Sequence, residues 1–379
     1  MVKLSDNELH THADRLLGVL GWWWWEVSLY AAVALVAEQF IGKLNIAALA
    51  DPAVLFRSND SLLFESERAL RQAATTGEVA TYLARFGHFV ESADPIHPTL
   101  RESPDLLNQH LAVARQSTMS PDERLLRTRR ERTQAENLVR ALPGLRGVLA
   151  RWMLNSGQSH AAHTDDAVFH FQRVLAHVRA TFLEVGRRMT SMGTLEKAED
   201  IFYVEYGELR KDRSDLAELV TTRRSLRESQ KRLAPPPYIP PLFDPAWESD
   251  RSWKLFSSSL GETVLKRGVQ ERNEKKIIVG TPGSPGRARG IARVITGPDD
   301  FGHFQPGDVL VAHTTTPIWT PLFNIASAAV TEVGGPFSHA AIVAREFGIP
   351  LVTGAIDATQ VIVDDAPVVV DGSAGIVEL

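Results

Sequence analysis

One histidine, His339, lies in the stretch TEVGGPFSHAAIVAREFGIPLV, between a glycine pair and an alanine- and valine-rich run. A neutral imidazole nitrogen is nucleophilic near neutral pH without losing a proton first, so it can attack a phosphoryl group directly. The run AAVTEV before the glycines predicts a strand, and Ser338 predicts the N-cap of a helix that reaches Phe347 and stops at Gly348. The unpaired N–H groups at a helix N-terminus favour an anion. Position alone, however, is more typical of a histidine with a structural role.

Hydroxyl and glycine residues near this histidine suggest how a phosphoryl group could be held. The threonines 314–316 follow the strand-like run DVLVA, and their hydroxyls could donate hydrogen bonds to phosphoryl oxygens; a loop that is merely rich in hydroxyls is the alternative. Arg345, two turns into the predicted helix, suggests a structural or docking role. The residues predicted to bind the phosphoryl group are Gly334, Gly335, Ser338, Thr315 and Thr316.

The elements that must position His339 follow from one sharp change in composition. Residues 1–232 are rich in Leu, Ala, Arg and Glu with helical spacing, and predict a mainly helical domain. Within this domain, the arginine-rich stretch ERLLRTRRERTQAENLVR is predicted to form a solvated helix face. Residues 233–277 hold the run LAPPPYIPPLFDP and a helical piece, and predict a proline-rich linker and helical connector. Residues 278–379 predict a compact β-rich α/β domain, with strands at GIARVI, DVLVA, AAVTEV, QVIV, PVVV and GIVEL.

Composition excludes several classes of protein. The 379 residues carry a net charge of -5 and 44% hydrophobic residues, so we expect a folded protein with no basic footprint for nucleic acid. The absence of cysteine excludes disulfides, thiolate metal sites and cysteine nucleophiles. The start MVKLSDNELHTHADRLL lacks the apolar core of a signal peptide, and we expect a cytoplasmic protein.

The most apolar segment, Leu16 to Gly42, holds four successive tryptophans, residues 22–25. Glu26 interrupts the segment, and the uninterrupted part, 27–37, is too short to span a membrane. Four consecutive side chains point all round a helix and cannot share one face. The segment therefore predicts a helix buried between layers, an aromatic wall of a ligand pocket, or both.

The segment from Val279 to Leu379 resembles the swivelling phosphohistidine domain of the family that contains phosphoenolpyruvate synthase, pyruvate phosphate dikinase and rifampicin phosphotransferase. The matching stretches are GSPGRARGIARVI, GDVLVAHTTTPIWTPLF, VTEVGGPFSHAAIVAREFGIPLVTG and VVVDGSAGIVEL. The resemblance implies a mainly helical N-terminal domain followed by a swivelling β/β/α domain, in which His339 carries the phosphoryl group on nitrogen. One departure is Asp365, where the family pattern has glycine.

Two parts known from the family are not recognisable in these residues. Members that use ATP carry an ATP-grasp region, and members that use pyruvate or phosphoenolpyruvate carry a (β/α)₈ barrel. No glycine-rich phosphate loop is present either. The resemblance therefore implies a separate ATP-grasp subunit that supplies the phosphoryl group with ATP and Mg²⁺, and we expect no metal on this chain alone.

The helical half resembles, more weakly, the acceptor-binding region of rifampicin phosphotransferase-like proteins, at YLARFGHFVESADPIHPTLRESPDLL and LEVGRRMTSMGTLEKAEDIFYVEYGELR. The match places His88, Glu91 and Asp94 on the family's histidine and acids, while Phe89 replaces an arginine. The family's Arg-Glu pair is replaced by acids at residues 165–166, which implies a different acceptor. A split between an ATP-using subunit and an acceptor subunit is typical of phenylphosphate synthase-type enzymes, which phosphorylate phenols.

These residues predict how an acceptor hydroxyl would lose its proton. His88 is the candidate base, oriented by Glu91 or Asp94; a histidine that caps or bridges helices is the alternative. The predicted acceptor pocket contains Trp22, Trp25, Phe89, Glu91 and Asp94, and would suit a small aromatic hydroxyl compound. Two other classes remain open: a non-catalytic phosphohistidine carrier or regulatory module, and a protein that binds an aromatic antibiotic without modifying it.

Overall fold

A computed structural model describes residues 4–46, 49, 52–57, 62–117, 120–209, 215–231, 233, 268–272, 275–336 and 338–379. The chain divides into two compact units. Unit 1 comprises Met1–Trp23, Ser92–His97 and Arg173–Leu255, and unit 2 comprises Trp24–Glu91, Pro98–Gln172 and Phe256–Leu379. Most of the helical region thus shares a unit with the C-terminal strands, whereas the boundaries predicted at residues 232 and 278 follow composition and stay a prediction.

Two long helices, α1 (Asp6–Lys43) and α6 (Gly144–Ser191), contribute to both units. Unit 1 also contains η3 (Ala198–Tyr203) and α7 (Leu216–Gln230). Its core is a small apolar cluster of Leu195, Ile201, Leu216 and Val220. Arg188 on α6 forms an ion pair with Asp6 at the start of α1, with 2.7 Å between the nearest nitrogen and oxygen.

Short helices build the N-terminal part of unit 2. They are η1 (Pro52–Phe56), α2 (Leu62–Thr76), α3 (Val79–Phe86), η2 (Leu100–Glu102), α4 (Pro104–Gln116) and α5 (Pro121–Arg140). Local signals set their ends: at α5, Ser120 and Glu123 form a reciprocal capping box around Pro121.

The C-terminal part of unit 2 is a mixed sheet of nine described strands. They are β1 (Gly268–Arg272), β2 (Lys275–Val279), β3 (Thr281–Ser284), β4 (Arg287–Ile295), β5 (Val309–Ala312), β6 (Ala328–Thr331), β7 (Leu351–Thr353), β8 (Pro367–Asp371) and β9 (Ile376–Glu378). Their order is β1-β2-β9-β8-β4-β5-β6-β7-β3, and β4 to β7 pair in parallel. Four short helices connect them: η4 (Pro298–His303), η5 (Pro317–Trp319), α10 (Thr320–Phe323) and α12 (Ala358–Val361), in addition to α11 (His339–Phe347). The predicted fold class, a mainly helical region followed by an α/β domain, is confirmed.

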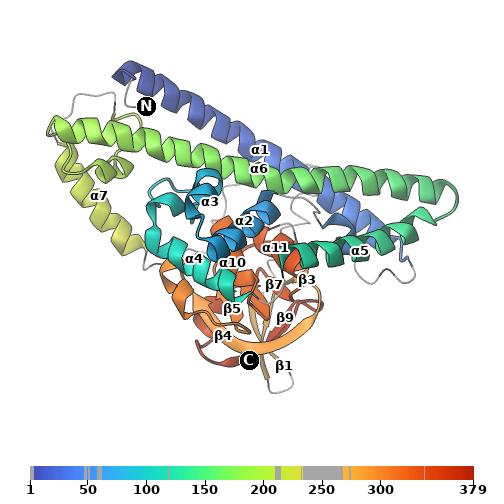
Figure 1. Cartoon of the computed structure of the whole chain (residues 1–379). Helices are drawn as coiled ribbons and strands as arrows, with labels where there is room; N and C mark the ends of the chain where they lie inside the picture. The colour runs from blue at the N-terminus through green and yellow to red at the C-terminus, as the bar shows by residue number, and fades with distance from the viewer. Residues whose placement is uncertain are drawn as a thin grey trace, which may run out of the picture. The chain divides into compact units, whose positions relative to one another are not determined.

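The central strands are buried on both faces, and alternate side chains enter two different cores. Val309 and Val311 pack in the cluster that also contains Ala358 of α12. Leu310 and Ala312 face the other way, into a cluster shared with α10, α11 and the helices α2 to α4. Figure 1 shows α2, α4, α10 and α11 on the same side of the sheet. The sheet domain and the short helices of unit 2 therefore share one hydrophobic core.

Two local predictions are wrong. QVIV, residues 360–363, is not the predicted strand: its first two residues are the end of α12. The Glu332 carboxylate accepts hydrogen bonds from the backbone N–H (2.8 Å) and hydroxyl (2.6 Å) of Thr359, which stabilises the first turn of this helix. The connector is not helical at its C-terminal end, where β1 and β2 form an antiparallel hairpin and β2 continues the sheet by pairing with β9. Residues 234–267, most of the predicted linker, lie outside the described residues.

Candidate functional site

His339 is the first residue of α11, and local chemistry explains why the helix begins there. The Ser338 hydroxyl accepts a hydrogen bond from the backbone N–H of Ala341 (3.4 Å), and Gly348 ends the helix with a left-handed φ of 69°. The preceding turn needs Gly334, whose φ is 132° and whose added Cβ would lie 2.7 Å from the Thr353 hydroxyl oxygen. The helix predicted around His339 is confirmed at both ends.

The two ring nitrogens of His339 have different surroundings. One is hydrogen-bonded to the backbone of Thr316, whereas Nε2 is buried and has no hydrogen-bond partner among the described residues. Burial lowers the pKa of the imidazole to about 4, although the hydrogen bond to Thr316 acts in the opposite direction. The ring is therefore neutral at neutral pH, with a donor N–H facing the Thr316 carbonyl and a lone pair on Nε2.

The loop after β5 contacts both His339 and the helical part of unit 2. The Thr316 hydroxyl donates a hydrogen bond to the Val90 carbonyl (3.2 Å), while the Thr315 hydroxyl is buried without a partner among the described residues. His313, earlier in the loop, contacts the Glu332 carboxylate through Nδ1 at 2.6 Å. The predicted phosphoryl-binding groups thus lie on the segments that flank His339, and their role stays a prediction.

Residues 88–91 lie against this loop. The carbonyl of Val90, which holds Thr316, also accepts a hydrogen bond from the Gln172 side chain of α6 (3.4 Å). The half-buried His88 ring packs edge-on against Phe169, with ring centroids 4.5 Å apart. A carboxylate oxygen of Glu91 would lie 3.3 Å from a Cβ added to Gly297. The structure therefore brings the segment of His88 and Glu91 to the loop that holds His339.

Other residues of the predicted acceptor pocket have structural contacts. Asp94, in unit 1, pairs with Arg227 (2.7 Å) and accepts a hydrogen bond from the backbone N–H of Ile96 (3.0 Å). Phe89 is 2% exposed and packs in the core of unit 2. Trp22, in unit 1, is 58% exposed, so it is not a buried helix residue. The side chain of Trp25 lies outside the described residues.

Arg345 has structural contacts, which is one of the two roles predicted for it, while the docking role stays a prediction. Its guanidinium donates hydrogen bonds to the carbonyls of Ala341 and Pro336, which fixes the turn before His339. The same group lies 3.4 Å from a Glu38 carboxylate oxygen on the part of α1 that belongs to unit 2. Asp166, by contrast, caps α2, since its carboxylate accepts the backbone N–H of Leu62 (3.2 Å). The side chain of Asp165 lies outside the described residues.

Sequence reasoning missed a buried charged contact between the short helices and α11. Arg124 on α5, predicted to be solvated, is 4% exposed and pairs with Glu67 at 2.6 Å. Its guanidinium also donates to the Asn324 side chain (2.8 Å) and lies 3.8 Å from the ring centroid of Phe347. Only its place one residue after the capping-box Glu123 distinguishes Arg124 in the sequence, and that place indicates no burial.

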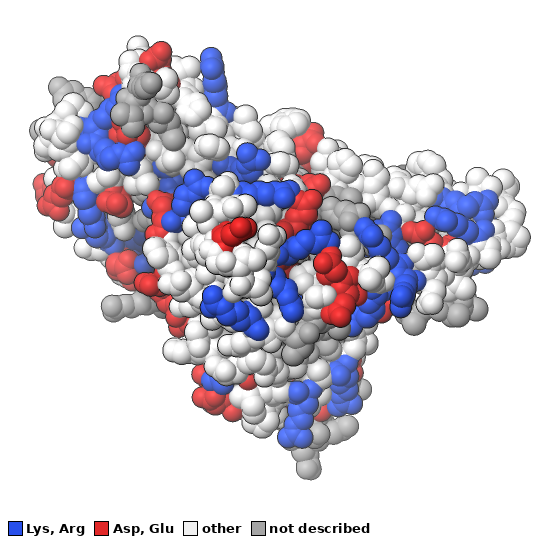
Figure 2. Space-filling model, viewed as in Figure 1, with Lys and Arg blue, Asp and Glu red and all other residues white. Residues whose placement is uncertain are grey.

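Neither surface charge on the face shown in Figure 2 nor possible metal ligands indicate a second site among the described residues. Figure 2 shows basic and acidic side chains mixed on the face it displays. Within the described part of the chain, no group of three or more His, Asp or Glu side chains is placed to hold a metal ion. No described helix is long and apolar enough to cross a membrane.

Comparisons with known proteins identify sequences to which this chain is similar. Residues 304–375, which include His339, match the family described as PEP-utilising enzyme, mobile domain. The chain is 33% identical over 240 residues to the uncharacterized phosphotransferase YvkC of Bacillus subtilis, covering 62% of this chain and 27% of that protein. It is 32% identical over 205 residues to a rifampicin phosphotransferase of Bacillus subtilis, covering 53% of this chain and 21% of that protein. It is 46% identical over 117 residues to a probable phosphoenolpyruvate synthase of Staphylothermus marinus, covering 30% of this chain and 14% of that protein. The alignments thus span at most 27% of the length of these relatives.

Proposed function

Because residues 304–375 match the mobile domain of PEP-utilising enzymes, we propose that the chain is a phosphotransferase that carries a phosphoryl group on His339. The observation that carries the proposal is the state of this imidazole at the N-terminus of α11. One nitrogen is held by Thr316, and Nε2 keeps a lone pair with no hydrogen-bond partner among the described residues. A neutral ring fixed in this tautomer is a nucleophile that needs no base.

The reaction would run in two steps. In the first, the Nε2 lone pair of His339 attacks the phosphorus of a donor, the N–P bond forms, and the P–O bond to the donor breaks. In the second, an acceptor hydroxyl oxygen attacks the same phosphorus, the N–P bond breaks, and the hydroxyl proton passes to a base. We propose that ATP and Mg²⁺ act on a separate ATP-grasp subunit that serves as the donor.

We propose His88 as the base of the second step, with Glu91 orienting it. The support is that the segment of these residues is hydrogen-bonded, through the Val90 carbonyl, to the loop that holds His339. The aromatic rings that surround His88, among them Phe169 at 4.5 Å, favour a phenol-like acceptor over a sugar. Asp94 has no part in this proposal, because it is paired with Arg227 in unit 1.

We propose that this structure, in which Nε2 is buried, corresponds to the acceptor side of the cycle. A nitrogen with almost no accessible surface cannot meet a donor protein, so the sheet domain must leave the short helices before the first step. The hydrogen bond from Thr316 to the Val90 carbonyl supports a second step near residues 88–91.

Phosphoramidate tests the first step without a donor protein. The Nε2 lone pair of His339 attacks its phosphorus, the histidine N–P bond forms, and the P–N bond of phosphoramidate breaks with release of ammonia. The chain should acquire acid-labile, base-stable phosphate, and His339→Gln should abolish it. His313→Gln is the matched control, since His313 lies in the same domain and pairs with Glu332. Phosphate retained in His339→Gln would refute the proposal.

The second step is tested by adding phenol to the loaded chain and measuring phenyl phosphate. His88→Ala should leave loading intact and slow transfer by about a hundredfold. Equal loss of both steps would assign His88 a folding role, and loading without transfer to any alcohol would favour a non-catalytic carrier. Steady ATP consumption by the isolated chain would contradict a separate donor subunit.

A further inference from the structure

The first turns of α6, in unit 2, carry large apolar side chains that are open to solvent. Leu145, Val148, Leu149 and Trp152 are 88%, 56%, 46% and 63% exposed. Their spacing of three, one and three residues places them on one face of the helix, which is called the α6 stripe below. Single exposed apolar residues are normal on a protein surface, but a contiguous group of this kind marks an interaction site.

The opposite face of the same turns is already buried. Ala150 and Leu154 are 0% and 1% exposed and pack in a cluster with Ile41 of α1 and Val139 of α5. This part of α6 is therefore apolar on two opposite sides, and α1 and α5 cover only one of them. A helix that is apolar all round is expected to be covered all round, so the α6 stripe requires a partner of its own.

The size of the α6 stripe can be compared with what a stable interface needs. Its exposed surface is on the order of 400 Å², if each large apolar side chain carries about 150 Å² when fully exposed. A stable interface buries about 800 Å² on each partner, of which a little more than half is apolar. The stripe thus supplies the apolar centre of one half of such an interface, and the polar residues around it supply the rim.

The order of the intervals in the α6 stripe is the same from either end. When two identical helices pack antiparallel across a two-fold axis, the residue at one end of the segment faces the residue at the other end. With the axis between positions 148 and 149, Trp152 would face Leu145 of the partner subunit, and Val148 would face Leu149 of the partner subunit. A second copy of the chain therefore fits the stripe position by position.

The charges next to the α6 stripe are engaged within the chain. The Arg146 guanidinium donates to the Leu44 carbonyl, just after the end of α1. The Arg151 guanidinium donates to the carbonyls of Arg140 (3.2 Å) and Leu142 (3.3 Å), at the end of α5. The C-terminal ends of these helices carry a partial negative charge that favours both cations. The stripe itself contains no ionisable group, so two copies can meet without bringing like charges into contact at its centre.

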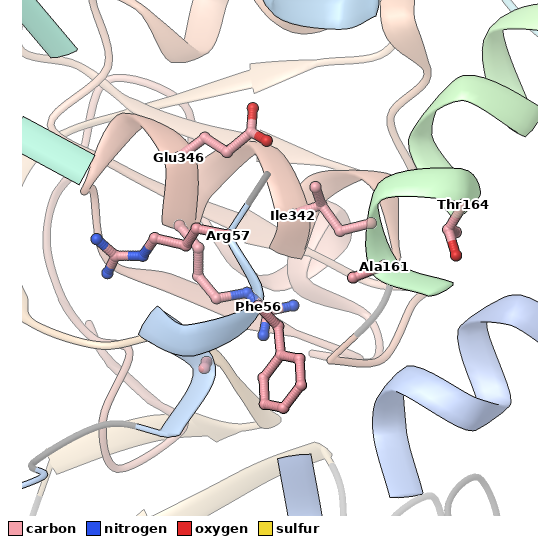
Figure 3. Close-up of a pocket in the computed structure, with 8 residues that line it drawn as sticks. Phe56, Arg57, Ala161, Thr164, Ile342 and Glu346 are labelled. Atoms are coloured by element: carbon pink, nitrogen blue, oxygen red, sulfur yellow. The ribbon is translucent and has the colours of Figure 1, made fainter. Parts of the chain in front are cut away.

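The α6 stripe lies away from the point where α6 meets the mobile domain. Figure 3 shows Ile342 of α11 pointing toward Ala161 on α6. Both residues line a cavity of about 20 Å³, which has room for little more than one water molecule. Ala161 follows Trp152 by nine residues, which is roughly 13 Å along a helix. A partner on the stripe would therefore leave this contact unchanged.

We propose that the α6 stripe is the contact surface of a homodimer, in which the stripes of two copies pack antiparallel across a two-fold axis. Association removes the apolar side chains of both copies from water, and this drives it. The inference goes beyond the proposed function and does not depend on it, because association needs neither a phosphoryl donor nor an acceptor.

Sedimentation velocity of the full chain at micromolar concentration tests the dimer. The wild type should sediment with twice the chain mass of 41.8 kDa. Val148→Glu places carboxylates of both copies near the axis and should weaken association about tenfold or more. Val363→Glu is the matched control, because it makes the same change at a 71% exposed valine of the sheet domain, and it should remain dimeric. Far-UV circular dichroism of both variants checks that they are folded.

Disulfide formation tests the antiparallel arrangement, because the chain contains no cysteine. Leu145→Cys and Trp152→Cys should each give little covalent dimer when oxidised alone. An equimolar mixture of the two variants should give a covalent dimer that contains one chain of each, since positions 145 and 152 would face each other. A parallel pair would give the reverse result.

The outcomes decide between a second copy and other occupants of the α6 stripe. A single-chain mass for the wild type would overturn the inference, as would a dimer that Val148→Glu and Val363→Glu leave equally intact. Binding of the single chain to vesicles that contain phosphatidylglycerol would assign the stripe to a lipid surface and would also overturn it. Loss of the dimer in Val148→Glu alone, together with the mixed disulfide, would support it whether or not His339 accepts a phosphoryl group.

Discussion

Acidification should weaken the contact between α4 and the sheet domain, because a buried histidine lies there. His110 is 1% exposed, and its ring stacks on Phe301 at 5.9 Å between centroids and an angle of 14°. Burial lowers the pKa of His110 to about 3, and neither ring nitrogen has a hydrogen-bond partner among the described residues. Protonation is therefore unfavourable while the two parts are packed together.

The sign and size of the effect follow from linkage. Above the ordinary histidine pKa of 6.5, the folded and unfolded states are both neutral at this position and stability is unaffected. Below that pH the unfolded state binds a proton and the folded state does not, so stability falls until the pH reaches the folded-state pKa near 3. At about pH 5 the loss is about 2 kcal/mol. His339, with its pKa lowered to about 4, should lose a similar amount.

Urea unfolding of the wild type and of His110→Phe, each at about pH 7.5 and about pH 5, measures this contribution. Phenylalanine keeps the ring contact with Phe301 but cannot titrate. Taking the difference between the two pH values cancels the pH-independent effect of the substitution. The wild type should lose about 2 kcal/mol more than His110→Phe. Equal losses in the two proteins would refute the assignment of a neutral, buried His110.

Two further predictions concern the turn before His339 and the buried ion pair. Gly334→Ala should destabilise the fold by about 1–3 kcal/mol, because the φ of Gly334 is positive. A Cβ added at Gly335 meets no atom within 4 Å, so Gly335→Ala should leave the melting temperature unchanged. Gly335→Ala should lower only the loading of His339 if the backbone at this residue holds the phosphoryl group. Arg124→Met should cost about 3–5 kcal/mol by leaving Glu67 buried and unpaired, and the double variant with Glu67→Met should recover most of it in urea unfolding. Equal melting temperatures for the two glycine variants, or no recovery in the double variant, would contradict these explanations.

The part of the site that sequence predicts is the part built by local chemistry. A capping serine and a left-handed glycine define α11, and valine-rich runs define β5 and β8, so each signal lies within a few residues of the structure it produces. QVIV misled because its periodicity is that of a strand, while a distant carboxylate, Glu332, determines the helix.

The contacts between segments could not be predicted, because the groups that make them have no signature in the sequence. Thr316 is joined to residues 88–91 through the backbone carbonyl of Val90, which every residue type possesses. Arg124 lies among five other arginines of the same stretch, and only the positions of Glu67 and Asn324 in the folded chain single it out for burial. Helical periodicity predicted which segments are helices, but not which of their charges would be enclosed.

The packing that buries Nε2 of His339 would link the two proposed steps of the reaction. An acceptor that binds only while the sheet domain is packed on the rest of unit 2 would favour that packed state over any state in which a donor can reach His339. A saturating acceptor should therefore slow the loading of His339 while promoting transfer from a histidine that is already loaded. Such opposite effects on the two steps distinguish an acceptor site formed by the mobile domain itself from one that lies wholly on the helices, where the acceptor would leave loading unaffected.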